Sequence, residues 1–375
     1  MNAAAKEYDG QNKYLRITDI DDTSRQFVSA DITSPDANLA EADNYRLSDG
    51  DVLFARTGAS VGKTYLYKKS DGLVYFAGFL IRAKIKESVS AGFIFQNTLT
   101  RSYERYIAIT SQRSGQPGVN AQEYAEYQLM LPELFEQEKI AKLLEALDTL
   151  ITLHQRKYEK LVNIKKSMLD KMFPPNGASV PEIRFKGFTD PWEQRKISEL
   201  AEKTYGGGTP TTSNEAFWNG NIPWIQSSDI VDGKLMGVEP RKYITQTGLN
   251  SSATQLVPKD SIAIITRVGV GKLAYMPFSY STSQDFLSLS KLNTEPFFTV
   301  YACYKKLQSE LNTVQGTSIK GITKDELLAK TISVPVYSEQ KQIGSFFIQL
   351  DTLITLHQRE HIKPILEVKR VKRNE

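Results

Sequence analysis

The ten residues Leu147–Arg156 read LDTLITLHQR, and the ten residues Leu350–Arg359 repeat the same letters without a change. The two copies lie 350 − 147 = 203 positions apart, more than half of the 375-residue chain. A repeat of this length is a whole domain plus a helix, because solenoid repeats are only a few tens of residues long. The sequence therefore predicts two related halves, each continued by the same helix.

Apolar residues recur at seven-residue spacing around the first copy of the decamer. This pattern predicts one long helix from about Glu136 to Met172, roughly 55 Å in length at about 1.5 Å per residue. A seam of this kind needs a second helix along it, and we expect the helix of the other half to supply it. The residues expected at this pairing are Ile140, Leu144, Leu147, Ile151, His154, Tyr158, Leu161, Ile343, Leu350, Ile354 and His357.

Composition limits the classes of protein to consider. The single cysteine, Cys303, excludes an internal disulfide framework, and three histidines leave few ligands for zinc. The net charge of +4 permits nucleic-acid binding without indicating it. No stretch is apolar enough to span a membrane and the N-terminal residues lack an apolar signal region, so the expected compartment is the cytoplasm.

Each half begins with a mixed α/β region. In the first, we expect strands at Tyr14–Ile20, Asp51–Arg56 and near Gln128–Leu131, and a helix at Arg101–Ser111. The second repeats this order, with Trp224–Ile230 matching Tyr14–Ile20, Asp260–Arg267 matching Asp51–Arg56, and Ile332–Pro335 matching Met130–Pro132. The predicted boundaries are a first domain at 1–135, a helix at 136–173, a linker at 174–191, a second domain at 192–336 and a helix at 337–375.

The stretch Gly58–Thr64, GASVGKT, is similar to a phosphate-binding loop. That loop needs four residues between its glycines, and here there are three. Two other interpretations remain open. The stretch is a glycine-rich hairpin turn, or its backbone approaches nucleic-acid phosphates between basic residues, which are Arg56, Lys63, Arg267 and Lys272 in the two halves.

Catalytic patterns are sparse. Asn221-Ile-Pro-Trp224 is similar to the motif with which amino-methyltransferases hold a flipped base, but Ile222 replaces a proline and no methyl-donor loop is evident. The histidines lie on helix faces, and no spacing suggests a nucleophile with its base. The sequence therefore favours a chain that is not an enzyme.

Polar loops of the mixed regions carry side chains that match the hydrogen-bonding edges of DNA bases in the major groove. They are equally typical of solvent-exposed loops. With the four basic residues above, the candidate DNA-binding residues are Gln112, Arg113, Gln116, Asn120, Thr209, Gln226, Ser227, Gln284, Thr317, Ser318 and Lys320.

Several segments, in this order, resemble the specificity (S, or HsdS) subunits of type I restriction–modification systems. They are Pro181–Leu200, Gly207–Pro210, Ile222–Asp229, Glu136–Ile140 leading into the decamer, and Lys165–Pro174. The resemblance implies mixed α+β target-recognition domains, two in pseudo-two-fold repeat, joined by two long antiparallel coiled-coil helices. It further implies that each domain binds one half of a split double-stranded DNA site.

The same resemblance implies partners and cofactors. The helices would recruit two methyltransferase (M) subunits, and restriction (R) subunits would join that core. S-adenosylmethionine, ATP and Mg would act in those partners, with none bound by this chain. No membrane partner is expected.

Two departures from the family pattern lead to an alternative function. The first domain lacks the opening seen at Trp192–Pro210 and is expected to be truncated, and Pro364 is expected to kink the second helix or end it early. The alternative is an inactive or regulatory fragment that binds the M subunit without reading DNA.

Overall fold

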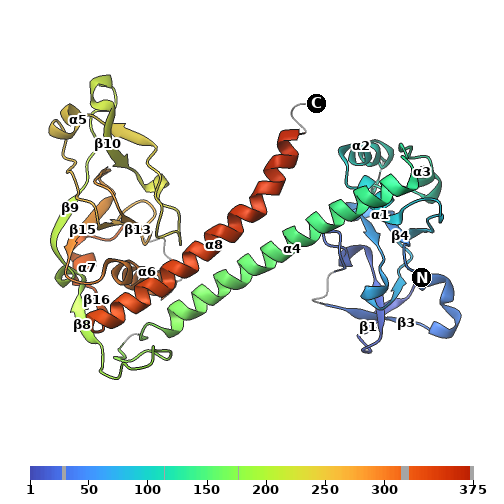
Figure 1. Ribbon diagram of the computed structural model, residues 1–375, viewed down its shortest axis with the longest axis horizontal. Coiled ribbons are helices and arrows are strands. Elements are labelled where there is room, and N and C mark those ends of the chain that lie inside the picture. Colours follow the sequence, from blue (N-terminus) through green and yellow to red (C-terminus); the bar gives the residue numbers. More distant parts are fainter. Residues whose placement is uncertain (28–30, 114, 176, 314–320, 372–375) are drawn as a thin grey trace. The chain divides into compact units, whose positions relative to one another are not determined.

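The computed structural model describes residues 1–27, 31–113, 115–175, 177–313 and 321–371, with residues 312–313 and 359–371 described by their backbone alone. The chain divides into two compact units, residues 1–154 and 155–375. The long helix α4 (Leu134–Lys171) belongs partly to each unit, because the division falls within the first decamer. The predicted fold class is confirmed: each unit contains one mixed α/β domain (Figure 1).

The domain of unit 2 is built on an antiparallel sheet of four strands in the order β13-β12-β15-β9. A second sheet has the order β11-β10-β14, and β8 pairs with β16. The strands are β8 (Glu193–Lys196), β9 (Ala201–Gly206), β10 (Trp218–Ile225), β11 (Lys242–Ile244), β12 (Ser261–Ile265), β13 (Leu273–Met276), β14 (Ser281–Thr282), β15 (Phe286–Leu292) and β16 (Thr331–Val334). The helices are α5 (Gln246–Asn250), α6 (Pro296–Thr313), α7 (Lys324–Ala329) and α8 (Tyr337–Val371).

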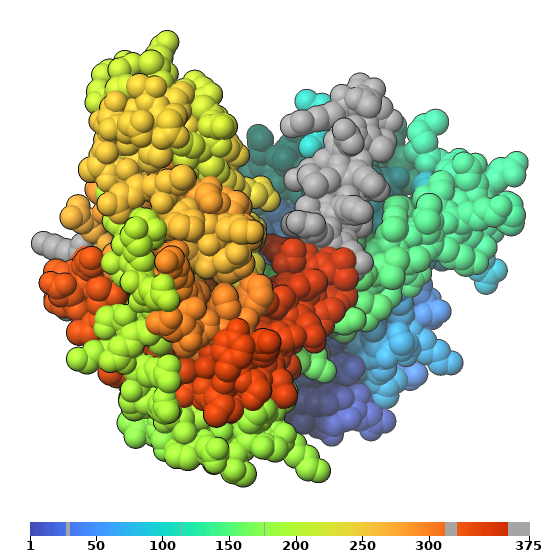
Figure 2. Space-filling model, turned by 60° about the vertical axis from the view of Figure 1, so that its left-hand side comes forward, coloured from blue at the N-terminus to red at the C-terminus, as the bar shows by residue number. Residues whose placement is uncertain are grey.

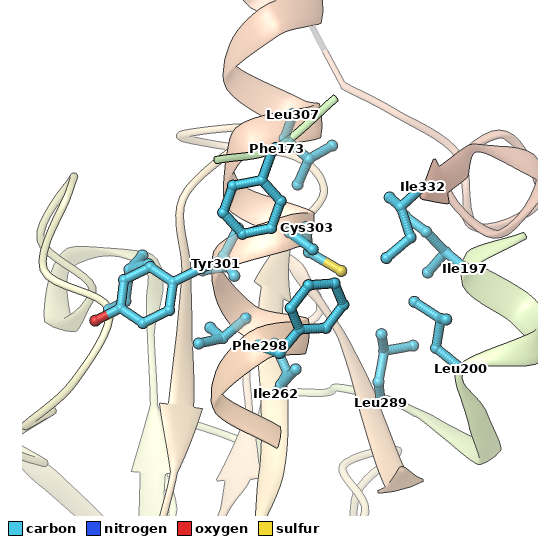
Figure 3. Packing of buried hydrophobic residues seen from close by; sticks show 14 of the residues in the cluster. Phe173, Ile197, Leu200, Ile262, Leu289, Phe298, Tyr301, Cys303, Leu307 and Ile332 are labelled. Atoms are coloured by element: carbon cyan, nitrogen blue, oxygen red, sulfur yellow. The ribbon is translucent and has the colours of Figure 1, made fainter. Parts of the chain in front are cut away.

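The core of unit 2 forms around one face of α6. Phe298, Tyr301 and Cys303 of this helix are fully buried, and they meet apolar side chains from β12, β15 and the end of α4 (Figure 3). Phe173, which follows α4, stacks on Phe298 with ring centroids 5.7 Å apart. Burial of aromatic side chains of this size is a major source of stability. Thus α4, α6 and the sheet form one hydrophobic core.

Within unit 2, α8 packs antiparallel to the end of α4. Phe347 lies 5.8 Å from Phe173 between ring centroids, whereas Asp351, one turn further along α8, pairs with the earlier residue Lys165 at 2.5 Å. The order of these contacts reverses along the two helices, as an antiparallel pair requires. In Figure 2 the first turns of α8, in orange-red, lie at the surface beside the lime-green chain after α4, where Arg184 pairs with Glu339 at 2.7 Å.

Unit 1 repeats this plan in reduced form. Its sheets have the orders β5-β4-β7, β2-β6 and β1-β3. The strands are β1 (Ala4–Glu7), β2 (Asn12–Leu15), β3 (Thr33–Asp36), β4 (Val52–Ala55), β5 (Thr64–Leu66), β6 (Leu73–Phe76) and β7 (Leu80–Ala83). The helices are α1 (Ala91–Asn97), α2 (Arg101–Thr110) and α3 (Ala121–Ala125), followed by the start of α4.

Equivalent hydrogen bonds relate the two units at atomic detail. The Gln137 amide accepts from the Ser90 N–H at 3.0 Å and donates to the Pro132 carbonyl at 2.7 Å. Gln340, 203 positions later, accepts from the Glu295 N–H at 2.8 Å and donates to the Pro335 carbonyl at 2.8 Å. Each glutamine thereby fixes the start of its long helix to its own domain.

The same comparison corrects one predicted match. The Ala55 N–H donates to the Lys63 carbonyl at 2.8 Å, and the Ile265 N–H donates to the Lys272 carbonyl at 2.9 Å. The next residues, Arg56 and Thr266, are therefore equivalent, and Arg267 follows one position later. The predicted match of Arg56 with Arg267 is therefore wrong by one residue.

Three local predictions are wrong. Residues 128–131 form no strand, because a strand needs a partner: the repeat-related β16 pairs with β8, and the described part of unit 1 has no counterpart of β8. Only the start of Tyr14–Ile20 is a strand, since Ile17–Asp19 is a 3-10 turn. The second long helix does not end at Pro364 but continues to Val371, because proline removes only one backbone donor of the helix; a kink at Pro364, the other expectation, stays a prediction.

The pair Gly344 and Glu295 shows how the halves have diverged. A Cβ on Gly344 would lie 2.5 Å from Glu295 Oε2 and 2.9 Å from the Phe298 nitrogen. At the repeat-related positions of unit 1, Gly92 stands in place of Glu295 and Ala141 in place of Gly344. A Cβ on Gly92 would lie 3.1 Å from that of Ala141. The buried Glu295 thus depends on a glycine near the start of α8.

Gly344→Ala should lower the free energy of unfolding of unit 2 by about 1–3 kcal/mol, because the added methyl group overpacks the Glu295 contact. Urea unfolding followed by tryptophan fluorescence measures this change, since all three tryptophans (Trp192, Trp218 and Trp224) lie in unit 2. Ser345→Ala, on an exposed position of the same helix, is the matched control. Equal stabilities of the two variants would contradict the steric account.

Candidate nucleic-acid interface

Loops from five separate segments meet on one surface of unit 2. The Gly208 N–H donates to the Thr282 carbonyl at 2.9 Å, and the Ser283 N–H donates to the Ile225 carbonyl at 2.9 Å. The Thr266 N–H donates to the Asp285 carbonyl at 2.7 Å, and its own carbonyl accepts from Ile322 at 2.7 Å. Backbone bonds therefore fix the loops after β9, β10, β12 and β14, and the chain before α7, against one another.

This surface brings together residues that the sequence placed far apart. Thr209 Oγ1 donates to Gln284 Oε1 at 2.7 Å, and both side chains are exposed. Gln226 and Ser227, half-buried, lie at the end of β10, which the Ser283 bond fixes beside Gln284. Arg267 is exposed at the tip of the β12–β13 hairpin, and Lys272 at its other end is half-buried. Thr317, Ser318 and Lys320 lie outside the described residues.

A buried carboxylate holds the turn that carries Gln226 and Ser227. Asp229 Oδ2 accepts from the Gln226 N–H at 2.9 Å, and its other oxygen accepts from Arg241 Nε at 2.6 Å. In unit 1 the half-buried Asp19 holds the corresponding turn, but its arginine is Arg16, the residue before the turn, whose N–H and Nε both donate to Asp19 at 2.9 Å.

Sequence reasoning missed Arg241 and Arg16. Both are basic groups beside the candidate surface, and the sequence signal available for them was an unused one, the aspartate repeated at the end of each 3-10 turn. It also missed Lys242, whose ammonium lies 5.8 Å from the ring centroids of both Trp218 and Trp224.

The corresponding loops of unit 1 also meet. The Gly58 N–H donates to the Pro117 carbonyl at 3.0 Å, and the Val119 N–H donates to the Arg56 carbonyl at 2.9 Å. The side chains of Arg56, Gln112 and Gln116 are exposed on this surface. Gly58 has a φ of +70°, a left-handed backbone conformation that favours glycine, and Gln116 Nε2 would lie 2.9 Å from a Cβ there.

Three other candidates of unit 1 have partners within the fold. Lys63 Nζ pairs with Asp22 at 2.5 Å. Asn120 caps α3 by accepting from the Gln122 and Glu123 N–H groups at 2.9 and 3.0 Å. Arg113 pairs with Glu123, whose pKa is lowered first by the hydrogen bond from the Asn120 backbone and then by Arg113. Arg113 and Asn120 therefore order the loop that presents Gln112 and Gln116, whereas Lys63 joins the turn after β4 to Asp22.

The phosphate-loop hypothesis is wrong for Gly58–Thr64. The Gly62 N–H lies 3.1 Å from both the Tyr124 hydroxyl and the Ala55 carbonyl, and the Lys63 N–H donates to Ser60 at 3.0 Å. The chain then enters β5, not the helix whose N-terminus a phosphate loop requires. The stretch is the glycine-rich turn that the sequence left as one alternative.

The part of the chain that the structure describes holds neither a cluster of metal ligands nor an activated cysteine. No three His, Cys, Asp or Glu side chains there are placed to hold a metal ion. Burial raises the pKa of the Cys303 thiol to about 12, so this thiol is not an activated nucleophile. No helix of the described ranges is long and apolar enough to cross a membrane.

The expected pairing residues lie on one face of each long helix, and all are buried or half-buried. In unit 2, Leu161 of α4 and Ile343 and Leu350 of α8 pack into the core around α6. This face therefore packs on the α/β domain as well as on the other helix. In unit 1, α4 contacts its own domain through Asp148, which accepts from Gln96 Nε2 at 2.8 Å.

Two α/β units with matched polar loop surfaces, each continued by a copy of one long helix, define an internally repeated binding protein. The family model described as "Type I restriction modification DNA specificity domain" matches residues 2–163 and 189–366. The chain belongs to this family.

Similar proteins agree with this assignment. The putative type I restriction enzyme MjaX specificity subunit of Methanocaldococcus jannaschii is 23% identical over 329 residues, 84% of this chain and 75% of that protein. The EcoR124I/EcoR124II specificity subunit of Escherichia coli is 30% identical over 169 residues, 43% of this chain and 41% of that protein. The type I restriction–modification S subunit from M. genitalium has the same fold, with a TM-score of 0.62 and 12% identity over 99% of this chain and 92% of that one.

Proposed function

We propose that this chain selects the DNA sequence on which a type I restriction–modification complex acts. Each unit would bind one half of a split double-stranded site through its loop surface. The observation that carries this proposal is the convergence, in both units, of loops from different strands onto one surface rich in amide and basic side chains. Amide and guanidinium groups match base edges in the major groove, and basic residues bind phosphates.

The long helices would provide the surface for partner subunits. We expect two methyltransferase subunits to bind α4 and α8, because the identical decamer gives two copies of one partner two equivalent faces. Restriction subunits would join this core. We propose that adenine methylation with S-adenosylmethionine, and cleavage with ATP and Mg, occur in those partners, that this chain is not itself an enzyme, and that the complex works in the cytoplasm.

Binding to DNA should depend strongly on salt. With the methyltransferase subunit present, the logarithm of the binding constant should fall linearly with the logarithm of salt concentration, with a slope of about −0.9 per phosphate contact. Fluorescence anisotropy of a labelled duplex at several salt concentrations measures this slope. Absence of any binding to double-stranded DNA at low salt would contradict the proposed function.

The alternative, a regulatory fragment that binds the methyltransferase subunit without reading DNA, predicts a different result. Pull-down of that subunit would succeed, whereas the complex would protect no DNA site. A stand-alone adaptor would instead form homodimers through its helices without a methyltransferase subunit.

A further inference from the structure

An arginine side chain lies against the Ser227–Asp229 turn of unit 2, beside the candidate DNA-binding residues. Arg241 Nε donates to Asp229 Oδ1 at 2.6 Å, and Arg241 Nη2 donates to Ser228 Oγ at 2.8 Å. The Asp229 side chain is fully buried, whereas 58% of the Arg241 side chain is exposed. One edge of the guanidinium group is therefore fixed to the turn, while much of the side chain remains open to solvent.

Unit 1 has a guanidinium group at the corresponding turn, Ile17–Asp19. Arg16 Nε donates to Asp19 Oδ2 at 2.9 Å, and Arg16 Nη2 donates to Asp19 Oδ1 at 2.8 Å. Arg16 precedes this turn, as Gln226 precedes the turn of unit 2, whereas Arg241 precedes β11. The two arginines are therefore not equivalent in the repeat. Both units place a guanidinium group beside the same turn, but from different parts of the chain.

The contacts with the turn use only one edge of each guanidinium group. This group has five N–H donors in a planar fork. Arg241 and Arg16 both use the Nε–H and one N–H of Nη2, which lie on the same edge. Among the residues that the structure describes, neither side chain makes a further hydrogen bond. The two N–H groups of Nη1 and the second one of Nη2 thus remain at the outer end, as donors for a ligand.

The ion pair determines which part of DNA suits these donors. Because the carboxylate oxygens lie at 2.6 Å in unit 2 and 2.9 Å in unit 1, each pair is nearly neutral at a distance and attracts phosphates weakly. The donors keep a fixed direction, and the side chain has already lost much of its rotamer freedom. Directed donors with little net charge fit a base edge better than a phosphate. In the major groove, guanine presents two adjacent acceptors, O6 and N7, that match the arginine fork.

We propose that Arg241 and Arg16 each read one guanine in the half-site of their own unit, through the outer end of the guanidinium group. Asp229 and Asp19 are positioning residues, because they orient the arginines and do not contact the base. This inference rests on the proposed function, and it assigns a base to one position in each half of the site.

The test uses the chain in complex with its methyltransferase subunit, and duplexes that carry the split motif mapped for the unaltered complex. The base 7-deazaguanine, which lacks the N7 acceptor but keeps Watson–Crick pairing, replaces each guanine of the motif in turn. For the unaltered complex, one such replacement in each half-site should weaken binding about tenfold in anisotropy titrations.

Arg241→Lys keeps a cation beside Asp229 but loses the planar fork, so the buried carboxylate retains a counter-charge. In this variant the ratio between the guanine and 7-deazaguanine affinities should fall to about one in the half-site of unit 2. The ratio should stay about tenfold in the other half-site. Arg16→Lys should give the opposite pattern.

Arg195→Lys is the matched control. Arg195 pairs with Glu193 at 2.7 Å on β8, which lies at the opposite end of unit 2 from β10 and α5 (Figure 1). This variant should keep both ratios. A ratio that Arg241→Lys leaves unchanged, or a half-site of unit 2 that contains no guanine, would overturn the inference while DNA binding persists. Absence of binding by the unaltered complex would instead contradict the proposed function.

Discussion

Asp351→Asn should lower the free energy of unfolding of unit 2 by about 3 kcal/mol, because it leaves a buried ammonium group without a counter-charge. Asp351 pairs with Lys165 at 2.5 Å and accepts from the Tyr301 hydroxyl at 2.5 Å. The side chains of Lys165 and Asp351 are only 11% and 19% exposed. This pair joins α4, α6 and α8, so its loss should loosen the contact between the two long helices. Tryptophan fluorescence during urea unfolding reports on unit 2 alone and measures the change.

The chain contains a matched control for this substitution. Asp148 has the same position in the first copy of the decamer, but it is exposed, and its carboxylate accepts a neutral hydrogen bond from Gln96 at 2.8 Å. Asp148→Asn should therefore cost less than about 1 kcal/mol. Because Asp148 lies in unit 1, far-UV circular dichroism during urea unfolding measures its effect, and the same signal is recorded for Asp351→Asn. Adding Lys165→Met to Asp351→Asn should recover part of the loss, because it removes the uncompensated charge. Equal effects of the two aspartate substitutions would show that the buried ion pair does not stabilise unit 2.

The double variant Arg267→Ala with Gln284→Ala should weaken specific DNA binding about a hundredfold, at about 1–3 kcal/mol for each lost base contact. Both side chains are exposed on the loop surface of unit 2, where the Thr209 bond orients Gln284. The loss should be restricted to the half-site that unit 2 reads. Anisotropy titrations with duplexes altered in one half-site or the other measure this restriction.

Arg56→Ala with Gln116→Ala, on the loop surface of unit 1, should affect the opposite half-site. The control is Lys291→Ala, which removes an exposed charge near the end of β15 that lies away from the loops. A loss of the same size in the Lys291 control would indicate a general effect of charge. Unchanged protection of both half-sites in the double variants would show that these loops are not the reading surface.

The repeat made much of the fold predictable. The seven-residue spacing placed the first long helix within two residues of its observed start and end, because a sustained apolar face specifies a helix by itself. The hairpin turn between β4 and β5 was one of the structures that the sequence predicted for the glycine-rich stretch Gly58–Thr64. Residues 128–131 were misassigned because a strand depends on a partner distant in sequence, and no local pattern shows that the partner is missing.

The candidate site was predictable only in part. The loops at 112–120 and 283–285 were recognised by composition, yet the roles of Lys63, Arg113 and Asn120 depend on Asp22, Glu123 and the start of α3. The decamer itself shows the limit most clearly. Asp148 and Asp351 have identical neighbours in sequence, but one lies at the surface and the other in a buried ion pair, because the residues that surround them belong to domains that have diverged.

The central claim is that two loop surfaces read two separate halves of one DNA site. Genome-wide mapping of methylated adenines, in cells that carry this chain with its methyltransferase subunit, tests it most directly. The account predicts a split motif with two specific parts and a fixed spacer, in which Arg267→Ala with Gln284→Ala alters one part and leaves the other unchanged. Methylation that does not depend on this chain, or a single contiguous motif that the unit 2 variant changes throughout, would contradict the account.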